Sequence, residues 1–297
     1  MSFTIRDLTV DDHPEVNSLC ETIWNGNDYV PDSFPNWIED KFSFPIGMFS
    51  DDQLVAFVNM ECVPNRSLAW VKGLRVKEEF RNQGHGSKIL GHLISKADAA
   101  GICSVMYATS SRNEASMKLA EKQGFKLTNS VGYFRLESPY PPHPKPSQSI
   151  HPIEVDEIRL TEILDVDETL MESSTFPVAW EFYRKDLESL ARLGKQAKIR
   201  VVIDDSGRIN TLYIVAVRKR RDFRTLTYTV YSSNRTVFVD VFSRILDELV
   251  DDKADRAAFF LGPRVEHWVD FIIDIPKEFA GRRFLLYERS TEKPGIG

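Results

Sequence analysis

The stretch Arg81-Asn82-Gln83-Gly84-His85-Gly86-Ser87 decides the fold, because it joins a predicted strand to a long amphipathic helix. The strand covers residues 68–76, and the helix covers residues 87–100, where apolar side chains recur at helical spacing. The first amides of a helix lack intrahelical acceptors and carry partial positive charge. The two glycines keep side chains out of the way of a ligand that approaches this backbone. The stretch therefore predicts a pyrophosphate site, to which Arg81 can add a charge-assisted contact.

The residues on both sides of this stretch alternate between strand and helix patterns. Strands are expected at 3–6, 47–49, 54–61, 68–76, 105–109 and 133–136, with helices from about residue 11, at 87–100 and at 114–122. Helices follow the strands that end at Val76 and Thr109. Such helical crossovers join parallel strands. The order therefore predicts an α/β (α+β) domain with a mixed, partly parallel sheet flanked by helices.

A proline-rich segment marks a change in composition. Five of the fifteen prolines lie within residues 138–146. Proline fixes φ and has no backbone donor, so this segment should be extended and outside any sheet. We expect domains at residues 1–137 and 153–297, joined by a linker at 138–152.

The second half repeats the order of elements more faintly. Helices are expected at 156–172, 177–192, 237–250 and 267–273, and strands at 199–203, 211–217, 225–231, 257–261 and 283–288. No glycine lies between Tyr231 and Val237, where the corresponding loop would stand. We interpret residues 153–297 as a degenerate second copy of the first domain, without a cofactor site, that packs on the first.

The bulk composition limits the classes of function. The chain has 297 residues, 42% of them hydrophobic, which suits two globular domains. A net charge of −6 argues against nucleic acid as a partner. Neither a signal peptide nor a membrane-spanning run is evident, so a cytoplasmic protein is expected. Cys20, Cys62 and Cys103 form neither a disulfide framework nor a metal site, and Cys103 is expected to be buried. The oligomeric state cannot be read from these features.

A second motif lies about 30 residues beyond the glycine loop. Asn113-Glu114-Ala115-Ser116 leads into Glu121-Lys122-Gln123-Gly124-Phe125. The Arg-x-x-Gly-x-Gly loop, followed by this segment, resembles the acetyl-CoA-binding core of the GNAT superfamily of N-acetyltransferases. The resemblance covers roughly residues 3–136. It implies a GNAT-type sheet and an acyltransferase that uses acetyl-CoA as cosubstrate, without a metal.

The resemblance also implies roles for individual residues. The backbone of Leu74 and Val76 would pair with the pantetheine arm of acetyl-CoA. The pyrophosphate would be held by Arg81 and by the amides of Gly84, His85, Gly86 and Ser87. Asn113 and Ser116 would contact the cofactor near its thiol end. The side chain of His85 is expected to be solvated.

The sequence departs from the family at the usual general acid. Many members carry a tyrosine where this chain has Ala120. Tyr133 is the first substitute for donating a proton to the leaving thiolate, and Tyr107 is the second. Glu61 is a candidate general base, acting directly or through water, and Glu79 is a weaker one.

The acceptor is expected to lie near residues 23–38, which are rich in aromatic and polar side chains. This segment resembles the corresponding part of histidine N-acetyltransferase-like proteins, which implies a free amino acid such as histidine as the acceptor. Asp28 and Tyr29 are candidate substrate contacts, and Lys72 or Arg135 could bind a carboxylate. Two alternatives stay open: a protein or peptide N-acetyltransferase, and a non-catalytic acetyl-CoA sensor.

Overall fold

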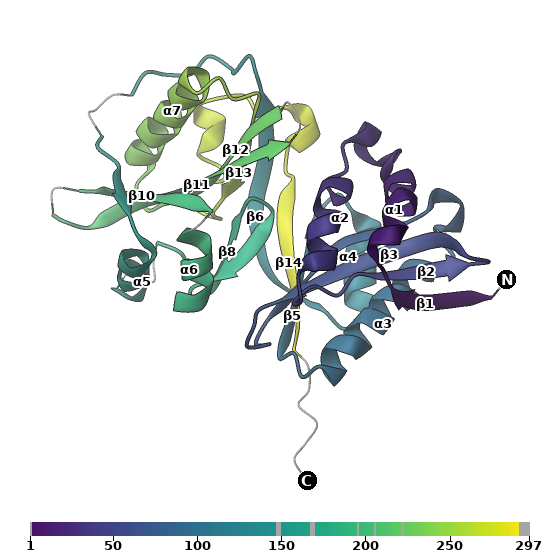
Figure 1. Cartoon of the computed structure of the whole chain (residues 1–297). Coiled ribbons are helices and arrows are strands. Elements are labelled where there is room, and N and C mark those ends of the chain that lie inside the picture. The colour runs from purple at the N-terminus through teal and green to yellow at the C-terminus, as the bar shows by residue number, and fades with distance from the viewer. Residues whose placement is uncertain are drawn as a thin grey trace, which may run out of the picture. The chain divides into compact units, whose positions relative to one another are not determined.

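The computed structural model describes residues 2–146, 150–166, 170–194, 196–204, 206–220 and 223–290. The chain divides into two compact units (Figure 1). Unit 1 comprises Met1–Thr109, Asn113–Thr128 and the chain from Leu286 onward, and unit 2 comprises Ser110–Arg112 and Asn129–Leu285. The boundary thus falls inside a strand, β6 (Lys126–Glu137), rather than at the expected residue 137.

Unit 1 is built on a mixed sheet, as predicted. Its strands are β1 (Phe3–Asp7), β2 (Ile46–Ser50), β3 (Gln53–Cys62), β4 (Ala69–Val76) and β5 (Ser104–Ser110), in that spatial order. The first four strands pair antiparallel. β4 and β5 pair parallel, which confirms the predicted crossover.

Helices lie on both faces of this sheet. Its helical elements are η1 (Val10–Asp12), α1 (His13–Cys20), η2 (Ile23–Gly26), α2 (Val30–Glu39), η3 (Glu78–Phe80), α3 (His85–Ala99) and α4 (Glu114–Lys122). Figure 1 shows α1 and α2 on one face and α3 on the other. Val16, Phe34 and Trp37 from α1 and α2 form a buried cluster with Phe49 and Phe57 of the sheet. This cluster fixes α2, which follows Asp28 and Tyr29, on the sheet.

The last strand, β14 (Arg283–Ser290), corrects the predicted domain assignment. It was expected to close the second domain, but from Leu286 onward it belongs to unit 1, and β5 is its neighbour in the sheet. Arg289 pairs with Asp98 at 2.9 Å, and the Tyr287 hydroxyl donates to Glu121 at 3.3 Å. A strand that is far away in sequence thus completes the first unit.

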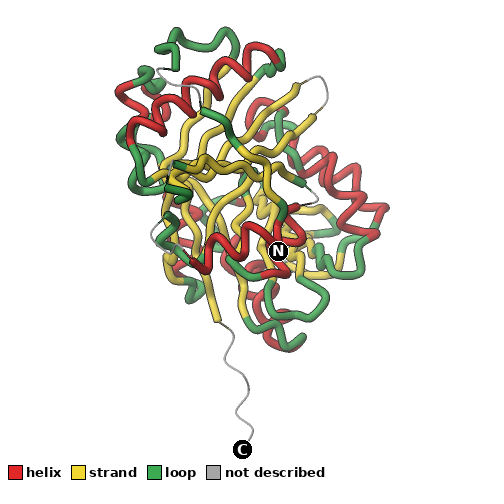
Figure 2. The backbone as a smooth tube through the Cα atoms, turned by 90° about the vertical axis from the view of Figure 1, so that its left-hand side faces the viewer, coloured by secondary structure: helices red, strands yellow, loops and turns green. Residues whose placement is uncertain are grey.

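Unit 2 contains parallel and antiparallel strands in the order β6, β13 (Arg256–Leu261), β12 (Phe223–Ser232), β11 (Ile209–Arg220), β10 (Ala197–Ile203) and β7 (Ile153–Val155). Its helical elements are α5 (Glu157–Val166), α6 (Leu187–Gly194), α7 (Arg235–Asp251), η4 (Val269–Phe271) and η5 (Lys277–Phe279). Figure 1 places α7 on one face and α5 with α6 on the other. In both units helices flank the strands (Figure 2).

The helix expected at 177–192 is wrong in its first half. Residues 175–184 form a hairpin of β8 (Thr175–Val178) and β9 (Glu181–Arg184), and only α6 is helical. Ala179 and Trp180 adopt positive φ values of 50° and 69°, which reverse the chain between the strands. Phe176, Phe182 and Tyr183 of the hairpin are all buried, so packing of the strands overrides the helical spacing.

Several smaller expectations have mixed outcomes. The linker residues 138–146 form no ladder. Residues 147–149 of the expected linker and residues 167–169 of the expected helix 156–172 lie outside the described part of the chain. Cys103 is exposed rather than buried, because it lies in the turn after α3. No helix in the described residues has both the length and the apolar character to cross a bilayer.

Candidate active site

The glycine loop ends in a helix whose first turn is open. Gly84 is the N-cap of α3 and has a φ of +84°, and Asn82 is also left-handed, with a φ of 60°. No side chain caps the helix. A Cβ added at Gly84 would meet nothing within 4 Å. The amides of the first helical turn are therefore available to an anion.

Two side chains hold the loop in this conformation. Arg81 Nε donates to the carbonyl of Val76 at 3.1 Å, which ties the loop to the end of β4. Gln83 Nε2 donates to the Glu79 carbonyl at 2.8 Å. Arg81 itself is exposed, so its remaining donors can reach a ligand phosphate.

The predicted loop residues differ in what their side chains do. His85 is 8% exposed rather than solvated, with its ring 4.5 Å from that of Phe3 and 5.8 Å from that of Phe80. Ser87 Oγ accepts a hydrogen bond from Gln123 Nε2 at 2.9 Å, which links α3 to the end of α4. His85 and Ser87 therefore offer only their backbone amides to a ligand.

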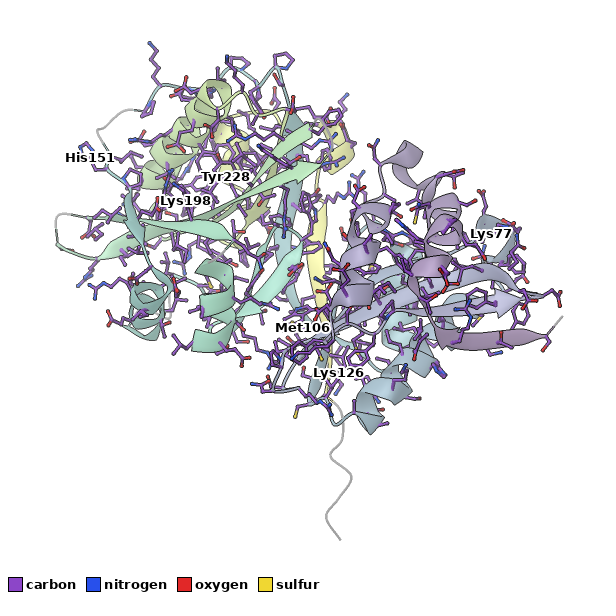
Figure 3. All side chains as sticks on the ribbon, in the orientation of Figure 1. Lys77, Met106, Lys126, His151, Lys198 and Tyr228 are labelled. Atoms are coloured by element: carbon purple, nitrogen blue, oxygen red, sulfur yellow. The ribbon has the colours of Figure 1, made fainter. Side chains whose placement is uncertain are left out.

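A bulge separates β4 from its neighbour at the point that the resemblance assigns to pantetheine. Phe57 of β3 pairs with Arg75 of β4 and Asn59 pairs with Lys72, so β4 has one extra residue in this stretch. Gly73, within it, has a φ of +63°. The parallel ladder with β5 ends at the pair Val71 and Tyr107 (Met106, the preceding residue, is labelled in Figure 3). Residues 72–76 of β4 are therefore not paired with β5. This edge places Leu74 and Val76 where an extended ligand can add to the strand.

Asn113 and Ser116 lie together at the start of α4. Asn113 Oδ1 accepts from the Ser116 amide at 3.2 Å and caps the helix. Ser116 Oγ lies 2.6 Å from the Tyr107 hydroxyl. The helix start that the second motif encodes thus carries a hydroxyl pair, with Tyr107 contributed by β5.

Burial keeps the Tyr107 phenol protonated. Burial raises its pKa above the usual value, and the hydrogen bond with Ser116 and the charge of Arg75 only partly oppose this rise. A neutral phenol is the form that can donate a proton. Ala120, where the family usually has its tyrosine, is fully buried, so no side chain from that position can act.

Tyr133, the first substitute for the missing acid, belongs to unit 2. Its ring is buried against Phe260, Phe279 and Phe284, and burial raises its pKa. Tyr107, the second substitute, is the tyrosine that unit 1 places beside Ser116.

Two ion pairs occupy the region expected to receive the acceptor. Glu61 of β3 accepts from Lys72 of β4 at 2.5 Å, and both side chains are partly exposed. Arg75 makes two hydrogen bonds to Asp28, at 2.6 and 2.8 Å. Its guanidinium carbon also lies 5.7 Å from the centre of the Tyr29 ring. The region therefore contains two carboxylate side chains and two cationic side chains beside an aromatic ring.

Asp28 is 1% exposed, so it acts on Arg75 rather than on a ligand. Burial would raise the pKa of Asp28, but the hydrogen bonds and charge of Arg75 outweigh burial and hold that pKa below its usual value. Tyr29 has more than a third of its surface exposed, and burial of its remainder raises its pKa. Of the two predicted substrate contacts, Tyr29 is the one that a ligand can reach.

Glu79 is a poorer candidate for the base. Lys77 (labelled in Figure 3) lies 2.9 Å from the Glu79 carboxylate, and its hydrogen bond lowers the pKa of Glu79. The sequence reasoning missed Arg75 and the pairing of Tyr107 with Ser116. Arg75 could have been noticed as a second cation, beside Lys72, in an otherwise mostly apolar strand.

Comparisons with known proteins bear on the fold. Residues 4–125 match the acetyltransferase (GNAT) family. A proposed acetyltransferase from Thermoplasma acidophilum aligns with 97% of this chain and 99% of its own, at 14% identity and a TM-score of 0.61. A tandem GNAT protein from the clavulanic acid biosynthesis pathway aligns over 98% and 99%, at 11% identity and a TM-score of 0.60. No curated protein matches the sequence. The fold is therefore that of two GNAT-like domains.

Proposed function

We propose that unit 1 transfers an acetyl group from acetyl-CoA to the amine of a small molecule, with a free amino acid such as histidine as the favoured acceptor. The observation that carries this proposal is the arrangement of three features within one unit. These features are the uncapped start of α3, the unpaired edge of β4 after its bulge, and the hydroxyl pair of Tyr107 with Ser116.

The residues present fit acetyl-CoA. The amides of residues 84–87 and the free donors of Arg81 suit its pyrophosphate, because they offer hydrogen bonds and positive charge. The backbone of Leu74 and Val76 suits the amide-containing pantetheine arm. Acetyl-CoA supplies the activated acetyl group as a thioester.

The chain's own groups supply the proton transfers. Tyr107 Oη is the proposed acid for the leaving thiolate, and its hydrogen bond with Ser116 fixes the position of the phenol. Glu61 is the proposed base, which takes a proton from the acceptor amine directly or through water. Lys72 Nζ lies 2.5 Å from the Glu61 carboxylate and fixes its position. The base is needed because only the neutral amine can attack the thioester.

The acceptor is proposed to lie beside Tyr29, Arg75 and the Glu61–Lys72 pair. A free amino acid carries both an amine and a carboxylate, and this region contains both acidic and basic side chains. The Tyr29 ring offers an aromatic surface on which an imidazole could stack.

Release of free thiol from acetyl-CoA tests the proposal across a panel of the twenty amino acids, simple amines and peptides with free N-termini. Acetylation of one or a few amino acids is expected, and faster turnover with peptides would favour the protein N-acetyltransferase. Tight acetyl-CoA binding without thiol release for any acceptor would favour the sensor. Glu61→Gln should lower kcat for the active acceptor, whereas Glu162→Gln, in an exposed pair with Arg159, should leave kcat unchanged.

A further inference from the structure

Three arginines of unit 2 gather around one short segment. The guanidinium carbons of Arg135 and Arg282 each lie 5.2 Å from the centre of the Phe279 ring. Arg112 Nη2 donates to the carbonyl of Ala280, the next residue, at 3.1 Å. Arg112 is exposed, and Arg135 and Arg282 are half-buried, so solvent reaches the group. We call Arg112, Arg135 and Arg282 the arginine cluster.

The arginine cluster lacks a counterion. Within the described residues, no carboxylate forms an ion pair with any of its three members, and Arg135 Nε is buried without a hydrogen-bond partner. The neighbouring arginine shows the contrast, because Arg283 reaches both carboxylate oxygens of Glu266, one of them at 2.7 Å. Partly buried cations that lack a partner are costly.

The electrostatics of Arg282 agree with this reading. Burial lowers its pKa, and the nearby charges of Arg135 and Arg112 lower the pKa further. The ring faces of Phe279 and Tyr133 offset only part of this repulsion, because a cation–π contact is weaker than pairing with an anion. An anion placed among the three guanidinium groups would remove the repulsion.

A strained turn lies on the aromatic side of the cluster. Ala179 and Trp180, between β8 and β9, both have positive φ, where hairpins of this kind usually have Asn-Gly. The turn places the Trp180 ring edge-on to Phe260, at 5.8 Å, and its indole hydrogen-bonds to Tyr133. Arg282 lies 5.4 Å from the same Tyr133 ring. Backbone strain of this kind persists where the surrounding structure requires it, often at binding sites.

We propose that the arginine cluster of unit 2 is a binding site for the carboxylate of a small molecule whose apolar part lies against the exposed side of the Trp180 indole. The planar guanidinium group can donate two parallel hydrogen bonds to a planar carboxylate. A ligand with a single carboxylate can place its apolar part on the aromatic side of the site. Each of the three guanidinium groups keeps N–H donors for a ligand, since Arg112 uses Nη2 for Ala280 and Arg282 uses Nε for Ser110 Oγ, at 3.0 Å. The site uses residues of unit 2 alone and does not depend on acetyl transfer in unit 1.

Calorimetric titration of the full chain, without acetyl-CoA, tests the site. The probes are acetate, phenylacetate and glutarate, each with its primary amide as the uncharged control, and inorganic phosphate. At least one carboxylate should bind, with its amide about tenfold weaker or worse. Binding of amide and carboxylate with equal affinity would overturn the proposal, and so would the absence of binding by every carboxylate. Tighter binding of phosphate would overturn the carboxylate assignment.

Variants locate the binding in the cluster. Arg135→Gln and Arg282→Gln should each weaken carboxylate binding about tenfold. Arg264→Gln is the matched control, because Arg264 belongs to the same unit but pairs with Glu172 at 3.1 Å. Arg135→Gln is the more informative variant, since its Nε has no partner whose loss could disturb folding. Unchanged binding in the folded Arg135→Gln and Arg282→Gln proteins would refute the site.

Trp180 provides an optical signal for the same experiment. Carboxylate binding should change the tryptophan fluorescence of the wild-type chain, and Trp180→Phe should lose that change while it still binds. A fluorescence change of full size in Trp180→Phe would place the ligand elsewhere.

Discussion

The hydroxyl of Tyr107 lies 2.6 Å from Ser116 Oγ, which joins β5 to the first turn of α4. Tyr107→Phe removes the proposed acid and leaves the aromatic ring in its buried place. We expect kcat to fall about 100-fold, with little change in KM for acetyl-CoA. Thiol release measured at saturating acceptor checks this. Because the pKa of Tyr107 is raised, wild-type activity should fall only above the usual tyrosine pKa near 10.

Ser116→Ala removes the hydroxyl that positions Tyr107, the proposed general acid, and leaves the Tyr107 phenol in place. The phenol stays, but it loses the hydrogen bond that holds it, so a smaller decrease in kcat than in Tyr107→Phe is expected. If Tyr107→Phe keeps wild-type turnover, the proton comes from another group.

The two ends of α3 offer a matched test of the anion site. Gly84 and Gly101 both have positive φ, of 84° and 70°, and a Cβ added to either meets nothing within 4 Å. A leucine at either position should cost about 1–2 kcal/mol of stability, since both are left-handed. Only Gly84→Leu should lose acetyl-CoA binding, because only Gly84 lies at the helix N-terminus. Equal binding by the two variants would refute the loop assignment.

The sequence predicted unit 1 well because its signals are local. The start of α3 after Gly84, the helix α4 and the strands β2 and β3 each depend on a few adjacent residues. The placement of β14 beside β5 could not be predicted, since Ser110 at the end of β5 and Arg283 at the start of β14 lie 173 positions apart. The β8–β9 hairpin was missed because Ala179 and Trp180 rarely adopt positive φ.

In the candidate site, too, the local features were predictable and the contacts between distant residues were not. The residues of the cofactor loop follow from the order and spacing of two motifs. The ion pairs of Asp28 with Arg75 and of Glu61 with Lys72 join residues that are 47 and 11 positions apart. Spacing alone cannot reveal such contacts, because they depend on how the sheet and α2 pack.

Ala120→Tyr tests whether the usual family acid can be restored. Ala120 is fully buried, so a phenol at this position overpacks the core. We expect a loss of about 2 kcal/mol in the free energy of unfolding and no gain in kcat. Chemical denaturation and thiol release measure the two quantities. A stable Ala120→Tyr variant with higher kcat would show that the site lacks an acid and that Tyr107 does not supply it.

Asp28→Asn tests the buried pair with Arg75. The variant leaves Arg75 without its charged partner, so the free energy of unfolding at pH 7 should fall by about 3 kcal/mol. Because the folded-state pKa of Asp28 is depressed, its contribution is complete above the unfolded value of 3.8 and is lost as the pH falls through the folded pKa. The difference between wild type and Asp28→Asn should therefore shrink below about pH 4. Glu162→Gln, which breaks an exposed pair, should change stability by less than about 1 kcal/mol. A difference that stays constant down to the lowest pH at which both proteins remain folded would show that Asp28 acts through packing rather than through its charge.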